Sequence, residues 1–202
     1  MRVAARVCGN PVLVNEIDRR ETELRQSRLA SALPRPDTSE GRQLRRWLTQ
    51  LIVAERVVAA EAVARGLRDS DVPENVLLPD TAARLEIGSV AASTLAAPLA
   101  RAVFVEVTAG VDVTDDEVAA YHARNPLRFA AKSAVAQQGW LGAPVAPTLA
   151  EVRDRIAATL LAAARRRAFR LWLDARCAAL VELAPGYEHP GDPRQPDNTH
   201  RH

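Results

Sequence analysis

Aromatic residues are scarce in this chain, at 4% of 202 residues. A core must therefore depend on leucine, valine, isoleucine and closely packed alanine. Hydrophobic residues still make up 48% of the sequence, which excludes a disordered chain and is sufficient for one ordinary domain or two small ones. Because alanine, leucine, arginine and glutamate are strong helix formers, the composition predicts a mainly α fold.

Neither sign of charge is in large excess. The 27 basic and 25 acidic residues leave a net charge of +2, which does not predict binding to nucleic acid or to a membrane surface. No run approaches the ~18 apolar residues that cross a bilayer, and residues 1–3 lead into patterned sequence without a signal peptide. We therefore expect a cytoplasmic protein with no nucleic-acid or membrane partner.

Residues suited to covalent chemistry are also few. The two cysteines, Cys8 and Cys177, are expected as free thiols in a reducing cytosol, with a bridge between them as the alternative. The sequence has no nucleophile elbow and no glycine-rich phosphate loop. Glu55 and Glu61 lie in an apolar segment that could suit acid/base work. However, Arg65 follows Glu61 by four residues, which favours a solvated ion pair. No catalytic residue is assigned.

The first forty residues predict short strands followed by a surface helix. Two β-branched runs flank a turn at residues 9–11, which predicts a hairpin or a bent strand. Asn15 can cap a helix that carries only a narrow apolar stripe. The proline-containing loop 33–41 is expected to end at Thr38 or Ser39 as a helix N-cap.

The strongest helical signal covers residues 39–66, where apolar side chains recur every three or four positions. Gly66 supplies the C-terminal stop. A third helix is expected from Asp80 or Thr81 through Leu95, limited by Pro98. Residues 103–107 remain ambiguous between helix and strand.

Two capping boxes mark the later helices. Thr114 with Glu117 predicts a helix to about Arg124, and Thr148 with Glu151 opens a last long helix over 148–180. Residues 130–147 are interpreted as a loop and 181–183 as a short strand. The basic run 165–167 on the last helix is interpreted as a solvated face. The predicted organisation is one helical domain over 1–184 and a Pro/His-rich tail over 185–202.

Four segments carry a resemblance to a known family: residues 7–18, 44–71, 111–129 and 149–183. In this order they resemble the chaperone domain of SurA/PrsA-type foldases, which is related in architecture to trigger factor. The resemblance implies a helical chaperone domain in which the closing strand pairs beside the N-terminal strand. Only 19 residues separate Phe129 from Leu149, too few for the parvulin-type prolyl isomerase domain of the full-length relatives. An isomerase-free member is therefore expected.

The resemblance implies a non-catalytic chaperone or assembly factor that binds a polypeptide client or a dedicated partner protein. The client would occupy an apolar cleft between the helix 39–66 and the closing helix. The candidate client-binding residues are Trp47, Leu51, Val58 and Trp172. A homodimer is left open.

The alternative is an accessory enzyme or a metal-handling protein that uses the C-terminal tail. No cofactor is expected on the first hypothesis. On the alternative, His189, His200 and His202 could chelate a transition metal, since imidazole suits zinc, nickel or copper. A tail this rich in proline offers no preorganised geometry, so a flexible or surface-draped tail is the competing interpretation.

Overall fold

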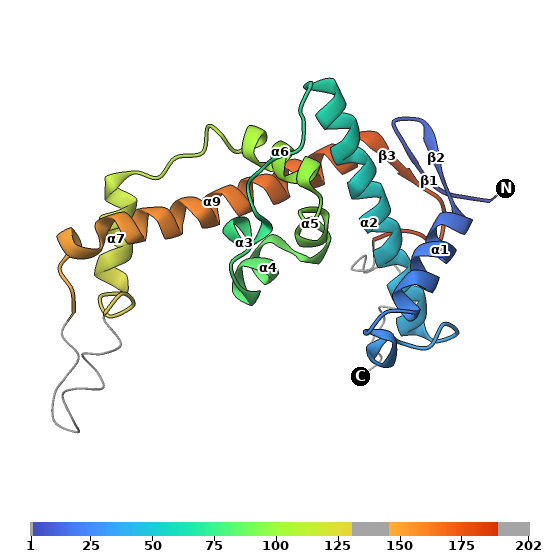
Figure 1. The fold of residues 1–202 in the computed structure, drawn as a ribbon, viewed down its shortest axis with the longest axis horizontal. Helices are drawn as coiled ribbons and strands as arrows, with labels where there is room; N and C mark the ends of the chain where they lie inside the picture. The colour runs from blue at the N-terminus through green and yellow to red at the C-terminus, as the bar shows by residue number, and fades with distance from the viewer. Residues whose placement is uncertain (1, 131–145, 190–202) are drawn as a thin grey trace. The chain divides into compact units, whose positions relative to one another are not determined.

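The computed structural model describes residues 2–130 and 146–189, and it confirms a mainly α fold with a small three-stranded sheet (Figure 1). The chain forms two compact units. Unit 1 comprises residues 1–107 and 169–202, and unit 2 comprises residues 108–168. The long helix α9 (Leu149–Leu180) contributes its first part to unit 2 and its last part to unit 1.

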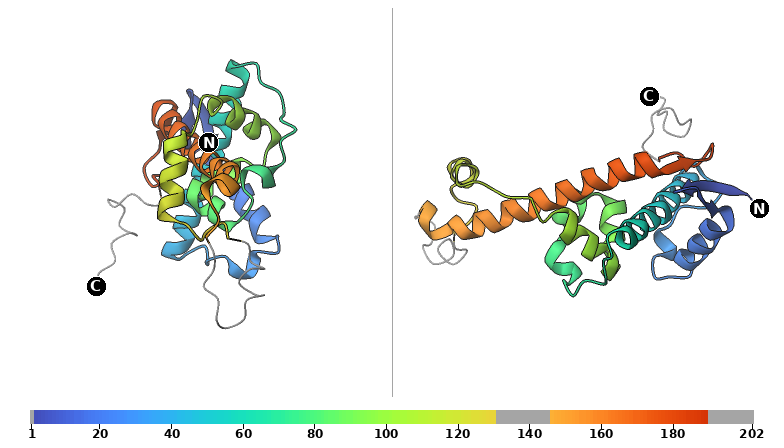
Figure 2. Two further views of the ribbon diagram at one scale, coloured as in Figure 1. Left: turned by 90° about the vertical axis from the view of Figure 1, so that its left-hand side faces the viewer. Right: turned by 90° about the horizontal axis from the view of Figure 1, so that it is seen from above.

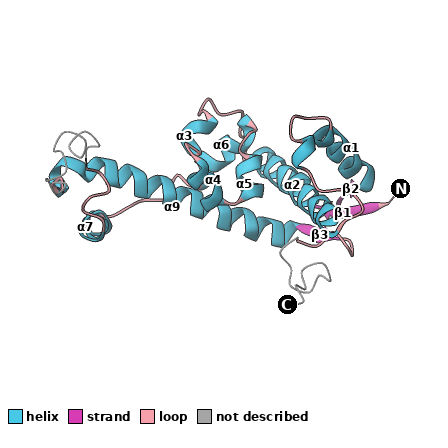
Figure 3. Ribbon diagram, turned by 90° about the horizontal axis from the view of Figure 1, so that it is seen from below, coloured by secondary structure: helices cyan, strands magenta, loops and turns pink. Residues whose placement is uncertain are grey.

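The sheet joins the two ends of unit 1. Strands β1 (Val3–Val7) and β2 (Asn10–Leu13) form an antiparallel hairpin, and β3 (Val181–Leu183) pairs antiparallel with the other edge of β1. Figure 3 shows the three strands side by side. The predicted pairing of the terminal strands is thus confirmed.

The hairpin turn lies one residue earlier than expected. Cys8 and Gly9 are its two central residues, with φ of 49° and 78°, as a two-residue hairpin with the right twist requires. Pro11 lies within β2, where it is tolerated because β2 is an edge strand.

Helix α1 (Val14–Arg25) begins without the predicted Asn15 cap. The carboxylate of Glu16 instead accepts a hydrogen bond of 2.8 Å from the backbone N–H of Leu13, which satisfies a donor that the helix end leaves free. Helix α1 is followed by the short 3-10 helix η1 (Ala30–Ala32).

Helix α2 (Ser39–Ala64) begins after the predicted cap, because the Thr38 hydroxyl accepts from the Gly41 N–H at 3.1 Å. Helix α1, strand β1 and two later helices of unit 1, α5 (Ser89–Thr94) and α6 (Pro98–Val107), pack against it (Figures 1 and 2). Burial on several sides explains why α2 is apolar over most of its circumference.

The third predicted helix is divided. The predicted range from Asp80 or Thr81 through Leu95 holds α4 (Thr81–Ile87) and α5 (Ser89–Thr94), and the one-turn helix α3 (Glu74–Leu77), which was not predicted, precedes them. Gly88 separates α4 from α5 with a φ of 90°, which an L-residue in a continuous helix does not adopt. Helix α6 (Pro98–Val107) begins at the proline and resolves the ambiguous residues 103–107 as helix.

The core of unit 1 is continuous from the sheet through α2 to α6 and the end of α9. Phe169 of α9 is fully buried, with its ring centroid 5.2 Å from Phe104 and 5.6 Å from Trp172. Tyr187, which lies in the segment 185–202 that the sequence assigned to the tail, is buried in this core. Arg46 and Gln50 also donate hydrogen bonds to the carbonyls of Gly186 and Tyr187, respectively.

Unit 2 consists of helix α7 (Asp115–Arg124) and the first part of α9. Its core holds three buried side chains among the described residues, Val118, Val152 and Ile156. Both predicted capping glutamates accept hydrogen bonds from the backbone N–H of their threonines, at 2.8 Å for Glu117 and 2.7 Å for Glu151.

One prediction for this part of α9 is corrected. Arg166 is buried, whereas Arg167 is exposed. The run 165–167 is therefore not uniformly solvated. Of the predicted loop 130–147, residues 131–145 lie outside the described residues.

Candidate functional site

A groove of about 480 Å³ runs between α2, the α4–α5 junction and the last turns of α9. We call it the α2–α9 groove, and all of its lining residues belong to unit 1. The lining residues are Gln50, Ala54, Ile87, Gly88, Ser89, Val90, Ala91, Arg170, Leu173, Asp174, Cys177 and His189. The groove thus lies beside the two long helices between which the sequence predicted an apolar client-binding cleft, and that role stays a prediction.

The groove has an apolar floor and a polar rim. Ala54, Ile87 and Leu173 are buried and come from three different elements. Arg170 and Asp174 are exposed on successive turns of α9. Such a surface can bury apolar groups of a ligand while its edges remain hydrated.

Two of the four candidate client-binding residues are not available at the surface. Leu51 and Val58 are 6% and 3% exposed, so the expectation that they contact a client is not met in this conformation. They belong to the core because α2 is covered on more sides than a surface helix.

The two candidate client-binding tryptophans, Trp47 and Trp172, are half-buried. The indole N–H of Trp47 donates to the hydroxyl of Ser89 at 3.1 Å, which places Trp47 beside the groove. Trp172 stacks on Phe169 and does not line the groove itself. The sequence missed the α4–α5 wall, whose only local signal is the glycine at position 88.

The thiol of Cys177 lies in the groove wall, but it is not an activated nucleophile. Burial, and to a lesser degree the charge of Asp174, raises the pKa of Cys177 to about 11. A nucleophilic cysteine requires the opposite shift, because the thiolate is the reactive form. Cys8 and Cys177 are both free, as expected, and Cys8 is exposed at the hairpin turn.

The predicted metal ligands are only partly within the described chain. His189 is exposed and lines the α2–α9 groove, whereas His200 and His202 lie outside the described residues. Within residues 2–130 and 146–189, no group of three or more His, Cys, Asp or Glu side chains is placed to hold a metal ion.

The two glutamates of α2 have structural partners. Glu61 is 6% exposed, which corrects the expected solvated pair, and it binds both Arg65 at 3.3 Å and Arg176 of α9. Glu55 forms an ion pair with Arg20 of α1. These contacts join α2 to its neighbours and leave neither carboxylate poised for acid/base chemistry.

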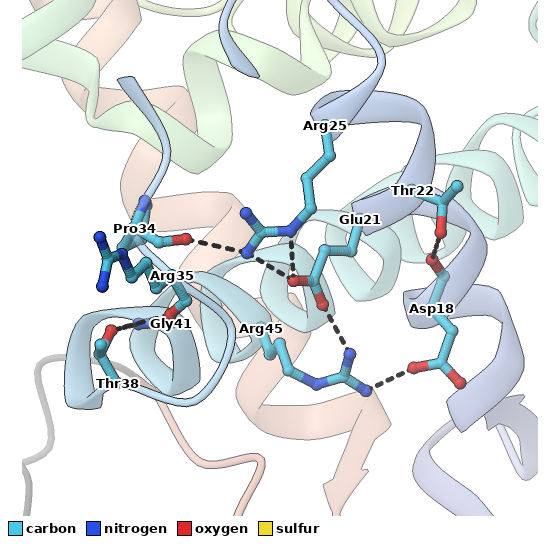
Figure 4. Close-up of polar contacts among 9 residues, drawn as sticks. All are labelled: Asp18, Glu21, Thr22, Arg25, Pro34, Arg35, Thr38, Gly41 and Arg45. Carbon is cyan, nitrogen blue, oxygen red and sulfur yellow. Dashed lines mark hydrogen bonds and ion pairs between the residues drawn. The ribbon is translucent and has the colours of Figure 1, made fainter. Parts of the chain in front are cut away.

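A second buried carboxylate, Glu21, was not anticipated from the sequence. It accepts from Arg25 of α1 at 2.7 Å and from Arg45 of α2 at 2.6 Å, and Arg45 also binds Asp18 at 2.6 Å. Figure 4 shows these four side chains, which we call the Glu21 cluster. Although burial opposes the charge of Arg45, the hydrogen bonds to Asp18 and Glu21 raise its pKa.

The Glu21 cluster also holds the loop before α2. Arg25 donates to the carbonyl of Pro34 at 2.9 Å, and Thr38 caps the helix beside it (Figure 4). Since every charge in the cluster is matched by a partner, the cluster serves to fix α1 on α2.

The fold is thus that of a mainly helical protein with paired terminal strands and with a mixed apolar and polar groove in unit 1. Residues 3–40, which form the hairpin, α1 and the loop before α2, match the model of a family of unknown function (DUF7158). No curated protein and no solved structure matches the chain. No helix in the described ranges is both long and apolar enough to cross a membrane.

Proposed function

We propose that this protein is a non-catalytic polypeptide-binding chaperone or assembly factor that resembles the SurA/PrsA-type chaperone domain and has no prolyl isomerase activity. The α2–α9 groove carries the proposal. Its occupant is an apolar segment of an unfolded polypeptide in the cytoplasm. The resemblance in the order of sequence segments, together with the paired terminal strands, supports this assignment.

Binding in such a groove requires no covalent step. Burial of client apolar surface releases roughly 25 cal/mol per Å², and a groove without deep specific pockets suits weak and reversible capture. The small side chains of Ala54 and Ala91 leave room along the floor. The rim charges of Arg170 and Asp174 can then bind the polar backbone of an extended segment.

The test uses two unrelated, permanently unfolded proteins labelled with fluorescein, for example reduced α-lactalbumin and reduced ribonuclease. Fluorescence anisotropy on titration with the full chain measures the affinity. Both should bind if the protein is a chaperone. If neither binds, general chaperoning is wrong, and dedicated pairing with one partner must be tested in its place.

A matched pair of variants locates the site. Cys177→Trp fills the groove, whereas Ala178→Trp adds the same ring to the next, exposed position of α9, which does not line it. We expect Cys177→Trp to weaken client binding about tenfold and Ala178→Trp to leave it unchanged. Far-UV circular dichroism establishes that each variant folds.

If Cys177→Trp does not fold, Asp174→Trp provides the same test from the exposed rim. Ala175→Trp is then its neighbour control, because Ala175 is exposed and does not line the groove. Equal affinities for the groove variant and its control would place client binding elsewhere on the molecule.

A further inference from the structure

The residues that follow β3 leave the sheet and lie against α2. We call residues 184–189 the 184–189 segment, and none of them belongs to a helix or a strand. The N–H of Ala184 still donates to a carbonyl of β1 at 2.9 Å. A β-turn with Pro185 and Gly186 at its centre follows, closed by a hydrogen bond of 3.1 Å from the Tyr187 N–H to the Ala184 carbonyl.

Side chains of α2 bind the backbone of this segment. The Nε of Arg46 donates to the carbonyl of Gly186, and the Nε2 of Gln50 donates to that of Tyr187, both at 3.3 Å. Positions 46 and 50 are about one helical turn apart and share a face of α2. Since every polypeptide carries backbone carbonyls, the same two donors can hold a segment of a different sequence.

Tyr187 is the apolar anchor of the segment. It is 8% exposed and packs in the core of unit 1, whereas Gly186 before it and His189 after it are exposed. An aromatic side chain buries a large apolar area with few rotatable bonds, and such residues dominate the binding of peptides at interfaces. The segment thus binds α2 in the manner of a short peptide with one aromatic anchor.

The place of the 184–189 segment is continuous with the α2–α9 groove. Gln50, which donates to the Tyr187 carbonyl, also lines the groove, and Ala54 lines it about one turn further along α2. His189, the last residue of the segment, lines the groove as well. An extended polypeptide in the groove that continued past Gln50 would therefore meet the segment.

The segment can leave α2 while the sheet stays paired. Both hydrogen bonds from α2 are longer than the usual range for N–H donors to oxygen, and their donors can bind water once the segment has left. Irregular segments open at a lower free energy than the helices and strands of a core. Opening would vacate the place of Tyr187 and release the donors of Arg46 and Gln50.

We propose that the 184–189 segment is an autoinhibitory occupant of the polypeptide-binding site, and that an aromatic side chain of a client displaces Tyr187. This inference rests on the proposed function, because it extends the α2–α9 groove to Arg46 and Gln50. The preferred client is an extended segment with an aromatic residue, whose backbone carbonyls accept from these two donors. Displacement of the tethered segment lowers the affinity for such clients.

The first test follows Tyr187 in the unchanged full chain. The sequence has two tyrosines, so labelling with 3-fluorotyrosine gives two fluorine NMR signals, which Tyr121→Phe assigns. We expect saturating reduced α-lactalbumin or reduced ribonuclease to move the Tyr187 signal to the position of free 3-fluorotyrosine. The Tyr121 signal should stay unchanged, since Tyr121 belongs to unit 2.

The second test needs no unfolded protein. Its probe is a peptide with the sequence of residues 184–189, Ala-Pro-Gly-Tyr-Glu-His, made with 3-fluorotyrosine so that fluorine line broadening measures weak binding. Tyr187→Ala in the full chain vacates the site and should bind the peptide at least about tenfold more tightly than the unchanged chain. In the unchanged chain the tethered segment competes at a high effective concentration. Tyr121→Ala is the matched control and should bind like the unchanged chain.

Two results would overturn the inference. One is client binding, measured by anisotropy, that leaves the Tyr187 signal away from the solvent-exposed position. The other is equal affinity of Tyr187→Ala and Tyr121→Ala for the peptide, with both variants folded by circular dichroism. If Tyr187→Ala does not fold, the signal of the unchanged chain decides. If neither unfolded protein binds, the proposed function fails, and the peptide alone decides whether the site accepts a separate segment.

Discussion

Unit 1 has a large hydrophobic core and unit 2 a small one, and the two cores are assembled from different kinds of contact. The core of unit 1 joins residues that are far apart in sequence, such as Val12, Val57 and Phe169. The three buried apolar side chains of the unit 2 cluster lie on two helices that begin with capping boxes. Unit 1 is thus stabilised mainly by long-range burial, and unit 2 depends more on local interactions at its helix ends.

The charged contacts follow the same division. In unit 1, Glu21 and Glu61 are each buried between two guanidinium groups. In unit 2, the ion pair of Arg153 with Asp115 has side chains 50% and 80% exposed, and exposed pairs contribute little. The buried pairs make unit 1 intolerant of change, since removal of one partner leaves the others uncompensated.

The largest expected effect comes from the aromatic core of unit 1. Phe169→Ala should lower the free energy of unfolding by about 3–5 kcal/mol, through lost burial and the cavity that remains. Urea denaturation measures this change. Ile156→Ala is the counterpart in unit 2, and native-state hydrogen exchange should show faster exchange in residues 115–124 with little change in α2. If Ile156→Ala accelerated exchange in both units equally, the two would unfold as one.

The next effect concerns the buried carboxylate of α2. Glu61→Gln removes a charge that Arg65 and Arg176 share, and we expect a loss of about 2–3 kcal/mol in the free energy of unfolding. Asp115→Asn is the exposed counterpart in unit 2 and should change stability by less than about 1 kcal/mol. Similar losses for the two variants in urea denaturation would mean that burial does not distinguish their ion pairs.

A smaller loss is expected where the loop before α2 crosses the helix. A Cβ added at Gly41 would lie 2.1 Å from the carbonyl oxygen of Arg35 and 2.7 Å from that of Pro36, so the loop must move. Gly41→Ala should cost about 1–3 kcal/mol, although alanine is the better helix former. Gly110→Ala in unit 2, where a Cβ meets nothing within 4 Å, should be close to neutral in the same thermal unfolding assay.

Gly41 illustrates what the sequence could and could not predict. The start of α2 was predictable, because the Thr38 cap is a local signal that depends on neighbouring residues alone. The need for glycine at position 41 was not, since it arises from the return of the loop over the helix. The division at Gly88 was missed for a related reason: the spacing of apolar residues in α4 and α5 is compatible with one helix.

The candidate site shows the same limit. The sequence located the two helices that flank the α2–α9 groove, but it selected Leu51 and Val58, which are buried. Periodicity shows that a face is apolar and cannot show whether another element covers it. Likewise, the pairing of Glu61 with Arg65 could be predicted from their spacing, whereas the contact with Arg176 depends on where α9 packs.

The smallest expected effect is a loss of helical structure in acid, which should differ between unit 1 and unit 2. Hydrogen bonds from Thr114 and Thr148 lower the pKa of Glu117 and Glu151 in the folded state. Their stabilising contribution is therefore complete above the unfolded pKa of about 4.3 and is lost as pH falls through the lowered folded pKa. The pKa of Glu40, at the start of α2, is lowered in the same way. Its carboxylate accepts hydrogen bonds from its own backbone N–H and from the side chains of Ser39 and Thr38.

Protonation of these glutamates should nevertheless affect α2 and α7 differently. Helix α2 is stabilised by burial along its length, whereas α7 depends more on its N-terminal cap. On acidification below about pH 4.3, Cα chemical shifts should report loss of helix at residues 115–118 before residues 40–43. Glu117→Gln should abolish the response in α7, since glutamine preserves the capping geometry without a titrating group. Simultaneous loss at both helix starts would show that burial of α2 does not compensate for its cap.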